Sequence, residues 1–204
     1  MRIKRFENSV FGSNSYVIDD GLNAVIFDIG DTPPIIEYLQ TSDLIPIALF
    51  ITHTHYDHIY GIRIFMDRFP DVPIYTSQFG KEAFRKPNWN FSRYHEDEIS
   101  IDSDSIRILE DGGEVHISDD IKVEVIATPG HDQSCLSYRI GSLLLTGDSY
   151  IPGVKVIASF PKSNKADAAY WYALLETMAS THSILPGHGE INMNLPTTST
   201  PPSW

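Results

Sequence analysis

The sequence contains little cysteine and no long hydrophobic run. Its 204 residues include one cysteine, Cys135, so no disulfide can form within the chain, which is typical of a reducing compartment. The longest apolar runs, such as Ile47–Ile51, are far shorter than the ~20 residues that cross a bilayer. Residues 1–14 are basic but are not followed by the apolar segment of a secretory signal. These features predict a soluble, cytoplasmic protein.

Positive charge is also scarce. The chain has 15 lysines and arginines against 27 aspartates and glutamates, and a formal net charge of −12. Affinity for nucleic acid and for anionic membrane surfaces comes largely from cationic side chains. We therefore expect neither of them as a partner, and expect a small-molecule substrate instead. The oligomeric state stays open, with a homodimer among the alternatives.

The order of the apolar patterns predicts an α/β protein. The expected strands are Ser15–Ile18, Ala24–Phe27, Ile47–Ile51, Pro73–Tyr75, Ile106–Leu109, Val115–Ile117, Ile121–Ile126, Ser134–Ile140, Leu143–Leu145 and Ile184–Leu185. The expected helices are Pro33–Gln40, Ile59–Phe69, Gln78–Phe84 and Ala166–Ser180. This order favours two packed sheets with helices outside, in a single domain over residues 1–195. Residues 196–204 are rich in Pro, Ser and Thr and are expected to form a tail.

Four possible metal ligands lie within six residues directly after the predicted buried strand. They belong to the segment Thr52-His53-Thr54-His55-Tyr56-Asp57-His58. Imidazole and carboxylate groups suit Zn²⁺, and also Fe or Mn. Alternate residues of an extended segment point to the same side, so His53 and His55 can bind one ion together. Asp57 and His58 follow where the chain turns into the next helix, and can face a second ion.

Three further candidate ligands occupy short loops that follow predicted strands. His131 lies in Thr-Pro-Gly-His, His188 in Leu-Pro-Gly-His-Gly, and Asp148 in Leu-Thr-Gly-Asp. Glycine and proline keep such segments in tight, non-helical turns that present the following side chain. The recurrence of this pattern beside the H-x-H-x-D-H motif favours metal binding over surface positions for these residues.

In these motifs and their order, the sequence resembles the metallo-β-lactamase-fold hydrolase superfamily. The resemblance runs from Asp28-Ile29-Gly30 to His188 and implies an αββα sandwich, two mixed β-sheets flanked by helices, with a metal site at one edge. It also implies which residues share an ion: His53, His55 and His131 would bind the first metal, Asp57, His58 and His188 the second, and Asp148 would bridge both. Asp28 resembles the family's supporting aspartate, which contacts a ligand rather than the metal.

Other candidate residues carry weaker signals. Tyr150, Lys155, Lys162 and Lys165 follow Asp148 in a loop that enters near the metals, and we predict that Tyr150 and Lys155 contact substrate. Tyr60 stands where many relatives have glycine after the motif, so its ring is expected to shape the pocket and to contact substrate. Cys135 is expected to be an inert buried thiol. His95, His116 and His182 are expected to be structural or exposed, and the segment Trp89–Tyr94 either a lid or core packing.

The predicted site is suited to hydrolysis. Two Zn²⁺ ions per chain lower the pKa of a bridging water to about 7 and supply hydroxide at neutral pH, so Asp57 and Asp148 are the predicted catalytic carboxylates. Among small members without a basic exosite, hydroxyacylglutathione hydrolases (glyoxalase II) are the most similar, which favours a thioester or a related ester or lactone as substrate. The glyoxalase II C-terminal helical domain has no counterpart here, which leaves the thiol carrier open.

Alternatives remain within the same ligand set. Some relatives bind a single non-haem iron and oxidise persulfides. Others hydrolyse lactones, β-lactams or phosphodiesters. A non-catalytic binding module ranks last, because such proteins generally lose a ligand and this chain keeps all seven.

Overall fold

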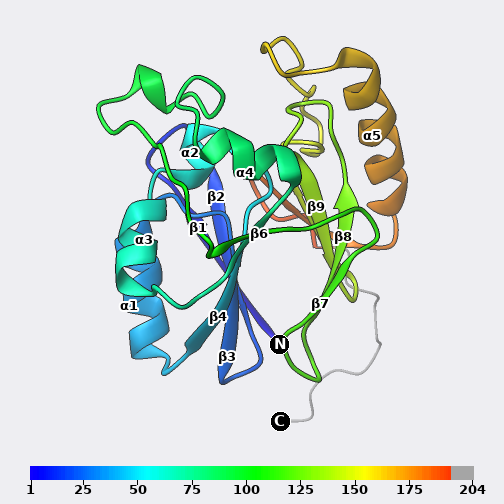
Figure 1. Ribbon diagram of the computed structural model, residues 1–204. Coiled ribbons are helices and arrows are strands. Elements are labelled where there is room, and N and C mark those ends of the chain that lie inside the picture. Colours follow the sequence, from blue (N-terminus) through cyan, green and yellow to red (C-terminus); the bar gives the residue numbers. More distant parts are fainter. Residues whose placement is uncertain (194–204) are drawn as a thin grey trace.

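The computed structural model describes residues 1–193, which form two β-sheets packed face to face with helices on both outer sides (Figure 1). The first sheet has the strand order β1-β2-β3-β4-β5-β6. Its strands are β1 (Arg2–Glu7), β2 (Asn14–Asp19), β3 (Asn23–Phe27), β4 (Ile45–Phe50), β5 (Ile74–Thr76) and β6 (Ile106–Ile108). β1, β2 and β3 pair antiparallel, and β3 to β6 pair parallel.

The second sheet has the order β11-β10-β9-β8-β7. Its strands are β7 (Glu114–His116), β8 (Lys122–Ala127), β9 (Leu136–Ile140), β10 (Leu143–Gly147) and β11 (Ser183–Pro186). Only the β10–β11 pair is parallel among the pairs of this sheet that the described residues form. Both sheets are therefore mixed, and the prediction of an αββα sandwich is confirmed.

Helices complete the outer layers. They are α1 (Thr32–Thr41), α2 (Tyr56–Ile59), α3 (Ile62–Arg68), α4 (Gln78–Phe84), the 3₁₀ turn η1 (Ser92–Tyr94) and α5 (Lys165–Met178). α1 and α3 lie on the first sheet, and α5 lies on the second (Figure 1). No helix within residues 1–193 is long and apolar enough to cross a membrane.

Three buried clusters follow from the alternation of side chains along the strands. In β3 and β4, Val25, Phe27 and Phe50 face the second sheet. Their neighbours Ile26 and Leu49 face the helices on the outside. Such alternation places an apolar residue in a core at every position of a strand that is buried on both faces. A third cluster, between the second sheet and α5, contains Leu144, Leu175 and Ile184 among others.

Two differences from the sequence predictions have local causes. Strand β1 was not predicted, because it is an edge strand with only two apolar residues, Ile3 and Phe6, among charged ones. The single helix predicted over Ile59–Phe69 is interrupted at Gly61, whose amide N–H donates to the carbonyl of Ile29. A side chain at Gly61 would collide with Thr32 and the backbone of Gly30. The predicted tail, 196–204, lies outside the described residues.

Candidate metal centre

The H-x-H-x-D-H motif lies at the end of β4, where the chain leaves the sheet. His53 and His55 follow the strand in an extended segment, and His55 has a φ of −67° and a ψ of 148° as the residue that precedes α2. Asp57 and His58 belong to the first turn of that helix. The change from extended chain to helix turns the two halves of the motif toward different sides of one site.

The other candidate ligands arrive from three loops of the second sheet. His131 follows β8, Asp148 follows β10, and His188 follows β11. The position of Asp148 depends on glycines, since Gly147 has a φ of 48° and a side chain at Gly187 would occupy the space of the Asp148 carboxylate. These loops bring residues 130 positions apart into contact, as in the 3.4 Å approach of His58 Nε2 to His188 Nε2.

The structure brings all seven residues of the predicted ligand set together. We call them the metal-site cluster: His53, His55, Asp57, His58, His131, Asp148 and His188. They form three overlapping groups, each with ligand atoms within 4.8 Å of one another: His53, His55 and His131; His53, His58 and Asp148; and Asp57, His58 and His188. The first and third groups contain the same residues as the two ion sites that the resemblance implied.

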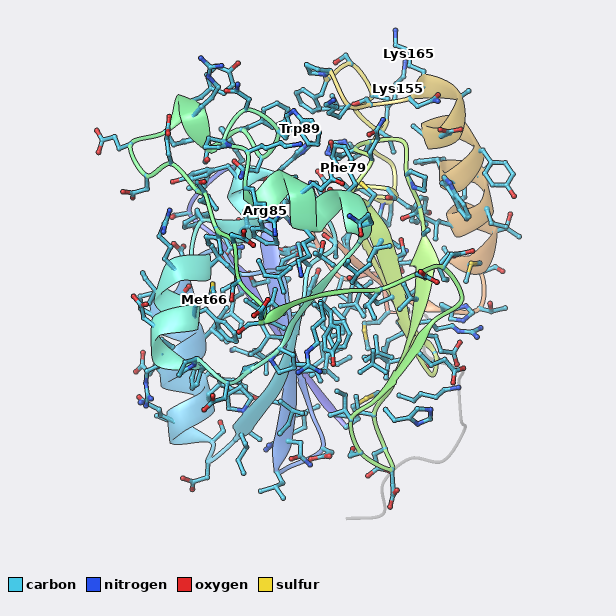
Figure 2. All side chains as sticks on the ribbon, viewed as in Figure 1. Met66, Phe79, Arg85, Trp89, Lys155 and Lys165 are labelled. Atoms are coloured by element: carbon cyan, nitrogen blue, oxygen red, sulfur yellow. The ribbon has the colours of Figure 1, made fainter. Side chains whose placement is uncertain are left out.

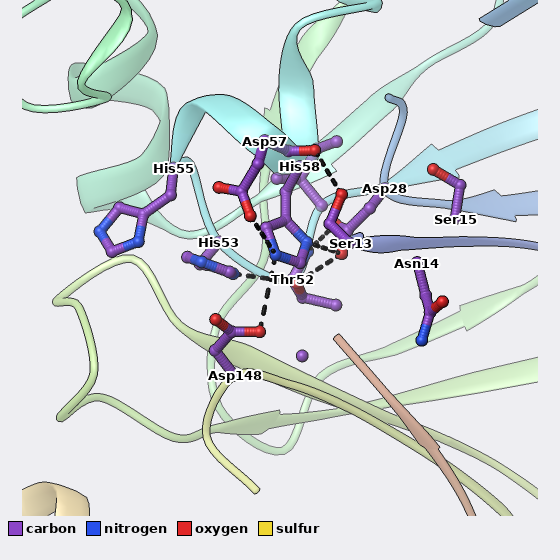
Figure 3. A network of polar contacts seen from close by, with 12 residues as sticks. Ser13, Asn14, Ser15, Asp28, Thr52, His53, His55, Asp57, His58 and Asp148 are labelled. Atoms are coloured by element: carbon purple, nitrogen blue, oxygen red, sulfur yellow. Dashed lines mark hydrogen bonds and ion pairs between the residues drawn. The ribbon is translucent and has the colours of Figure 1, made fainter. Parts of the chain in front are cut away.

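Asp148 lies between these two groups. Its Oδ2 is 3.5 Å from His131 Nε2 and 3.5 Å from His188 Nε2, and its Oδ1 is 3.5 Å from His58 Nε2. Figure 3 shows the Asp148 carboxylate facing Asp57 and His58 across the site. A carboxylate whose oxygens reach both groups has the placement required of a bridging ligand.

Four of the five histidines donate Nδ1–H to an oxygen outside the cluster. His58 donates to Asp28 Oδ2 (2.9 Å), His131 to the carbonyl of Ile157 (2.7 Å), and His188 to the carbonyl of Phe11 (3.2 Å). His53 Nδ1 lies 3.2 Å from Thr52 Oγ1, whose own proton goes to Asp28. In the neutral form of each ring these hydrogen bonds place the proton on Nδ1, so that Nε2, directed at the centre, is the nitrogen available to a metal.

Asp28 occupies the supporting position that the resemblance implied. Its backbone is left-handed, with a φ of 56°, and the residue is 2% exposed. It accepts hydrogen bonds from the Thr52 amide (2.7 Å), the Thr52 hydroxyl (2.7 Å) and His58 Nδ1. Asp28 therefore orients two histidines of the cluster, one directly and one through Thr52.

The electrostatics of the cluster suit cations. Burial raises the pKa of the Asp148 carboxyl, but His188 and His58 outweigh burial and hold that pKa well below its usual range. Burial lowers the pKa of His58 and of His188, yet the neighbouring carboxylates raise these values to about 9 and about 10. Burial holds the pKa of His53 well below its ordinary value.

Two atoms of the cluster that face its centre are buried without a hydrogen-bond partner among the described residues: His53 Nε2 and Asp148 Oδ1. Buried polar atoms of this kind are costly unless something binds them. Imidazole nitrogens and carboxylate oxygens are the ligands that zinc, iron and manganese accept. The residues present therefore fit a metal centre.

Comparison with known proteins identifies the family. Residues 8–188 match the metallo-β-lactamase superfamily. The chain belongs to this superfamily. A probable metallo-hydrolase of Streptococcus pyogenes is 26% identical over 93% of this chain and 84% of its own length. A hydroxyacylglutathione hydrolase of Xylella fastidiosa is 34% identical over 65% of this chain, but only 43% of that relative is matched.

Solved structures of the superfamily have the same fold. The BLEG-1 B3 metallo-β-lactamase superimposes with a TM-score of 0.81 and 24% identity, over 93% of both chains. A di-iron-bound form of the protein TTHA1623 superimposes with a TM-score of 0.79 and 21% identity, over 92% of this chain and 93% of that one. The predicted resemblance is confirmed, and with it the prediction of a metal-dependent hydrolase at the level of the superfamily.

The substrate-binding candidates lie in different surroundings. The Tyr60 hydroxyl donates to Asp31 Oδ1 (2.7 Å), and the Tyr60 ring stacks on Tyr56 at 5.6 Å. Tyr150 is 6% exposed and its ring packs in the cluster beneath α5, against Tyr172. The structure therefore gives the Tyr150 ring a packing position rather than one that faces substrate.

Lys155 is exposed and lines a groove of about 900 Å³ between residues 153–159 and α5. Lys165 lines the same groove, and Figure 2 shows both lysines near the start of α5. The walls between them are largely apolar and include Ile157 and Tyr172. Cys135 is 3% exposed, and burial raises the pKa of its thiol well above the ordinary value, as expected for an inert cysteine.

Aromatic rings flank the histidines of the first group. The Phe91 ring lies 4.7 Å from His55, and the Phe160 ring lies 5.3 Å from His55 and 5.7 Å from His131. Phe91 belongs to the predicted lid or core segment, but no periodicity distinguished Phe160. Its position follows from the long loop after β10, whose path only the folded chain defines.

The rest of the Trp89–Tyr94 segment forms a second aromatic contact. The Trp89 ring stacks at 4.9 Å on Phe79, a residue of α4, and Figure 2 shows Trp89 above that helix. Lys86 Nζ and Lys162 Nζ lie 3.5 and 4.1 Å from the centre of the Trp89 ring. The segment thus contacts both α4 and the loop after β10. Beyond it, His95 stacks on Tyr56 at 3.7 Å.

Proposed function

We propose that this protein is a zinc-dependent hydrolase that cleaves a small-molecule thioester or a related ester or lactone with a hydroxide held between two metal ions. The observation that carries the proposal is the position of Asp148, whose carboxylate oxygens reach residues of two three-residue ligand groups. This arrangement suits two neighbouring cations, and many hydrolytic enzymes use two metal ions.

The protein residues supply position and electrostatics. Two metals held by the metal-site cluster would lower the pKa of a bound water and would stabilise negative charge that develops on the substrate. Asp148 and Asp57 hold negative charge beside the histidines. Thr52, Asp28 and the Ile157 carbonyl keep the imidazole rings oriented, so little reorganisation is needed during the reaction.

The substrate class is supported by the surroundings of the cluster. Phe91 and Phe160 offer apolar surface next to His55, which suits an acyl group. Lys155 and Lys165 in the adjoining groove suit an anionic carrier, and we propose that Lys155 contacts it. The Tyr60 hydroxyl is held by Asp31, and we propose that the Tyr60 ring shapes the pocket and contacts substrate. The relative named hydroxyacylglutathione hydrolase is consistent with this class.

A mononuclear iron enzyme that oxidises persulfides is the second candidate. The group of His53, His55 and His131 is by itself a set of three ligands for one ion. The similar TTHA1623 structure, a di-iron-bound form, supports iron as the metal. Manganese is a further alternative for the same oxygen and nitrogen ligands. Metal analysis of protein purified without added metal separates these candidates: about one iron per chain with O₂ uptake would replace the hydrolase proposal.

The direct test is a hydrolysis screen of zinc-loaded protein. Thioesters, lactones, β-lactams and bis-p-nitrophenyl phosphate represent the substrate classes, and Asp57→Ala provides the matched inactive control. We expect thioesters or lactones to be cleaved fastest, and the Asp57→Ala variant to be at least ~10²-fold slower. Equal rates in the two proteins across the panel would overturn the proposal and favour a binding module.

The remaining proposals concern the cellular location, the binding partners and the oligomeric state of the protein. We propose a cytoplasmic location, supported by the presence of a single cysteine, which is buried. The net charge of −12 supports a small-molecule partner over nucleic acid or an anionic membrane. A homodimer stays one alternative, which the molar mass in solution tests.

A further inference from the structure

His55 is oriented differently from the other four histidines of the cluster. Its Nδ1, not its Nε2, faces the centre and lies 3.0 Å from His131 Nε2. For this nitrogen to bind a metal, the proton of the ring must sit on Nε2. The other four rings each have an oxygen that fixes their proton on Nδ1, so His55 needs an acceptor on its opposite edge.

A buried carboxylate faces that edge. Asp132 Oδ2 lies 3.6 Å from His55 Nε2, and the Asp132 side chain is 1% exposed. Neither atom has a hydrogen-bond partner within the described part of the chain. Asp132 belongs to none of the three ligand groups. Two orphaned polar atoms, one a ring nitrogen and one a carboxylate oxygen, are thus buried against each other.

The second oxygen of Asp132 is already occupied. Asp132 Oδ1 accepts hydrogen bonds from the Ser134 amide (2.8 Å) and the Ser134 hydroxyl (2.5 Å). The Ser134 hydroxyl in turn accepts from the amide of Thr54 (3.0 Å), the residue between His53 and His55. These contacts fix the rotation of the carboxylate, so that Oδ2 is the oxygen directed at His55.

We infer that Asp132 is a positioning residue that holds the proton of His55 on Nε2 and thereby makes Nδ1 available to the first metal. This inference rests on the metal centre of the proposed function. Carboxylates that accept from metal-binding histidines fix the tautomer and the direction of the ring, and their loss weakens metal binding by about 10–100-fold.

The variant Asp132→Asn separates this role from a merely structural one. Asparagine forms the same turn with the amide of the residue two positions later as aspartate does. Because the two Ser134 donors require an oxygen, the amide nitrogen that the substitution introduces would face His55 Nε2. A donor there opposes the Nε2–H form of the ring and favours the proton on Nδ1, the nitrogen that must bind metal.

The experiment is a zinc titration of metal-free protein against a chromophoric chelator. We expect Asp132→Asn to lower the affinity of the first site by about 10–100-fold. The control Ser134→Ala removes the hydroxyl but leaves the Ser134 amide to hold Asp132 Oδ1, so the carboxylate still faces His55 and the affinity should change less than in Asp132→Asn. Wild-type affinity in Asp132→Asn, or an equal loss in Ser134→Ala, would overturn the inference.

A measurement on the wild-type protein keeps the inference testable if Asp132→Asn does not fold. Long-range ¹H–¹⁵N spectra of zinc-loaded protein with ¹⁵N-labelled histidine report which ring nitrogen carries a proton. We expect His55 alone among the cluster histidines to be protonated on Nε2. A His55 ring without that proton would overturn the inference. Failure to bind any zinc would overturn the proposed function instead, so the two failures are distinguishable.

Discussion

At the scale of single residues, the site depends on which nitrogen of each histidine carries the proton. Thr52, Asp28 and the carbonyl groups of Ile157 and Phe11 each accept from a ring of the cluster. None of these acceptors is a ligand, yet each determines where the free nitrogen of its histidine points. Substitutions just outside the ligand set should therefore affect metal binding as well as those within it.

Asp148 is the residue on which both halves of the cluster depend. We expect Asp148→Ala to lower the hydrolytic kcat/KM by at least ~10²-fold, because both ligand groups lose a shared carboxylate. Steady-state kinetics with metal content measured by mass spectrometry test this. The control Cys135→Ser changes a buried thiol outside the ligand groups and should keep the metal content of the wild type. Wild-type turnover in Asp148→Ala with metal still bound would contradict the mechanism.

Metal binding should release protons at neutral pH. The neighbouring carboxylates raise the pKa of His58 to about 9 and of His188 to about 10, so both rings hold an extra proton at pH 7 in the metal-free protein. A metal displaces those protons, and we expect about two to be released per chain at pH 7. The release should fall as the pH rises through 9 and 10, where the free rings become neutral.

Calorimetric titration in buffers of different ionisation enthalpy measures this proton release. A heat of binding at neutral pH that does not depend on the ionisation enthalpy of the buffer would show that neither ring is protonated before metal binds. Binding should also weaken as the pH falls, because protons compete with the metal for the same nitrogens.

At the scale of elements, the motif depends on a short extended segment that leads from the end of strand β4 into the one-turn helix α2. The break after α2 keeps that helix to one turn, so that Asp57 and His58 face the site while α3 continues along the outside of the sheet. Gly61 permits the break, since it lies against Thr32 and the backbone of Gly30 at the start of α1. Gly61 therefore packs the end of the motif's helix directly against the start of α1, which lies on the outer face of the first sheet.

We therefore expect Gly61→Ala to destabilise the protein by about 1–3 kcal/mol, the usual cost of adding atoms to a closely packed contact. Urea denaturation measures the change in free energy of unfolding. The matched control is Ile64→Ala in the neighbouring helix α3, where the Ile64 side chain is 50% exposed. This substitution should change the free energy of unfolding by no more than about 0.5 kcal/mol. Equal effects of the two substitutions would show that Gly61 is not constrained by packing.

At the scale of the whole molecule, the site joins the two halves of the sandwich. The first sheet supplies His53 to His58, and the loops of the second sheet supply His131, Asp148 and His188. A ligand held by both sheets stabilises the folded state, because the unfolded chain does not hold these residues together. Metal should therefore contribute to the stability of the entire fold and not only to catalysis.

Chelation of the metal should lower the melting temperature. A metal present at 100 times its dissociation constant adds about 2.7 kcal/mol, which corresponds to about 5–10 °C for a chain of this size. Scanning calorimetry with and without a chelator measures the shift, and re-addition of zinc should restore it. The Asp148→Ala variant should show a smaller shift. An identical melting temperature in wild-type protein with and without chelator would contradict a shared site.

The sequence by itself determined the fold class and the identity of the seven clustered residues, because both depend on local patterns. Buried strands produce continuous apolar runs, and glycine-containing turns after strands present His131, Asp148 and His188. The edge strand β1 escaped prediction because it is paired on one side only and carries mostly charged residues.

Only the tertiary structure decided what surrounds these residues. The carbonyl of Ile157 behind His131, the Phe160 ring beside His55 and the carboxylate of Asp132 facing His55 involve partners 26 to 105 positions apart in the chain, and no periodicity encodes such pairs. The same holds for Tyr150, whose place in the sequence predicted substrate contact but whose ring packs under α5. The residue types and their spacing in the sequence identify the candidate metal ligands. The orientation of these side chains depends on contacts that form only when the two sheets pack together.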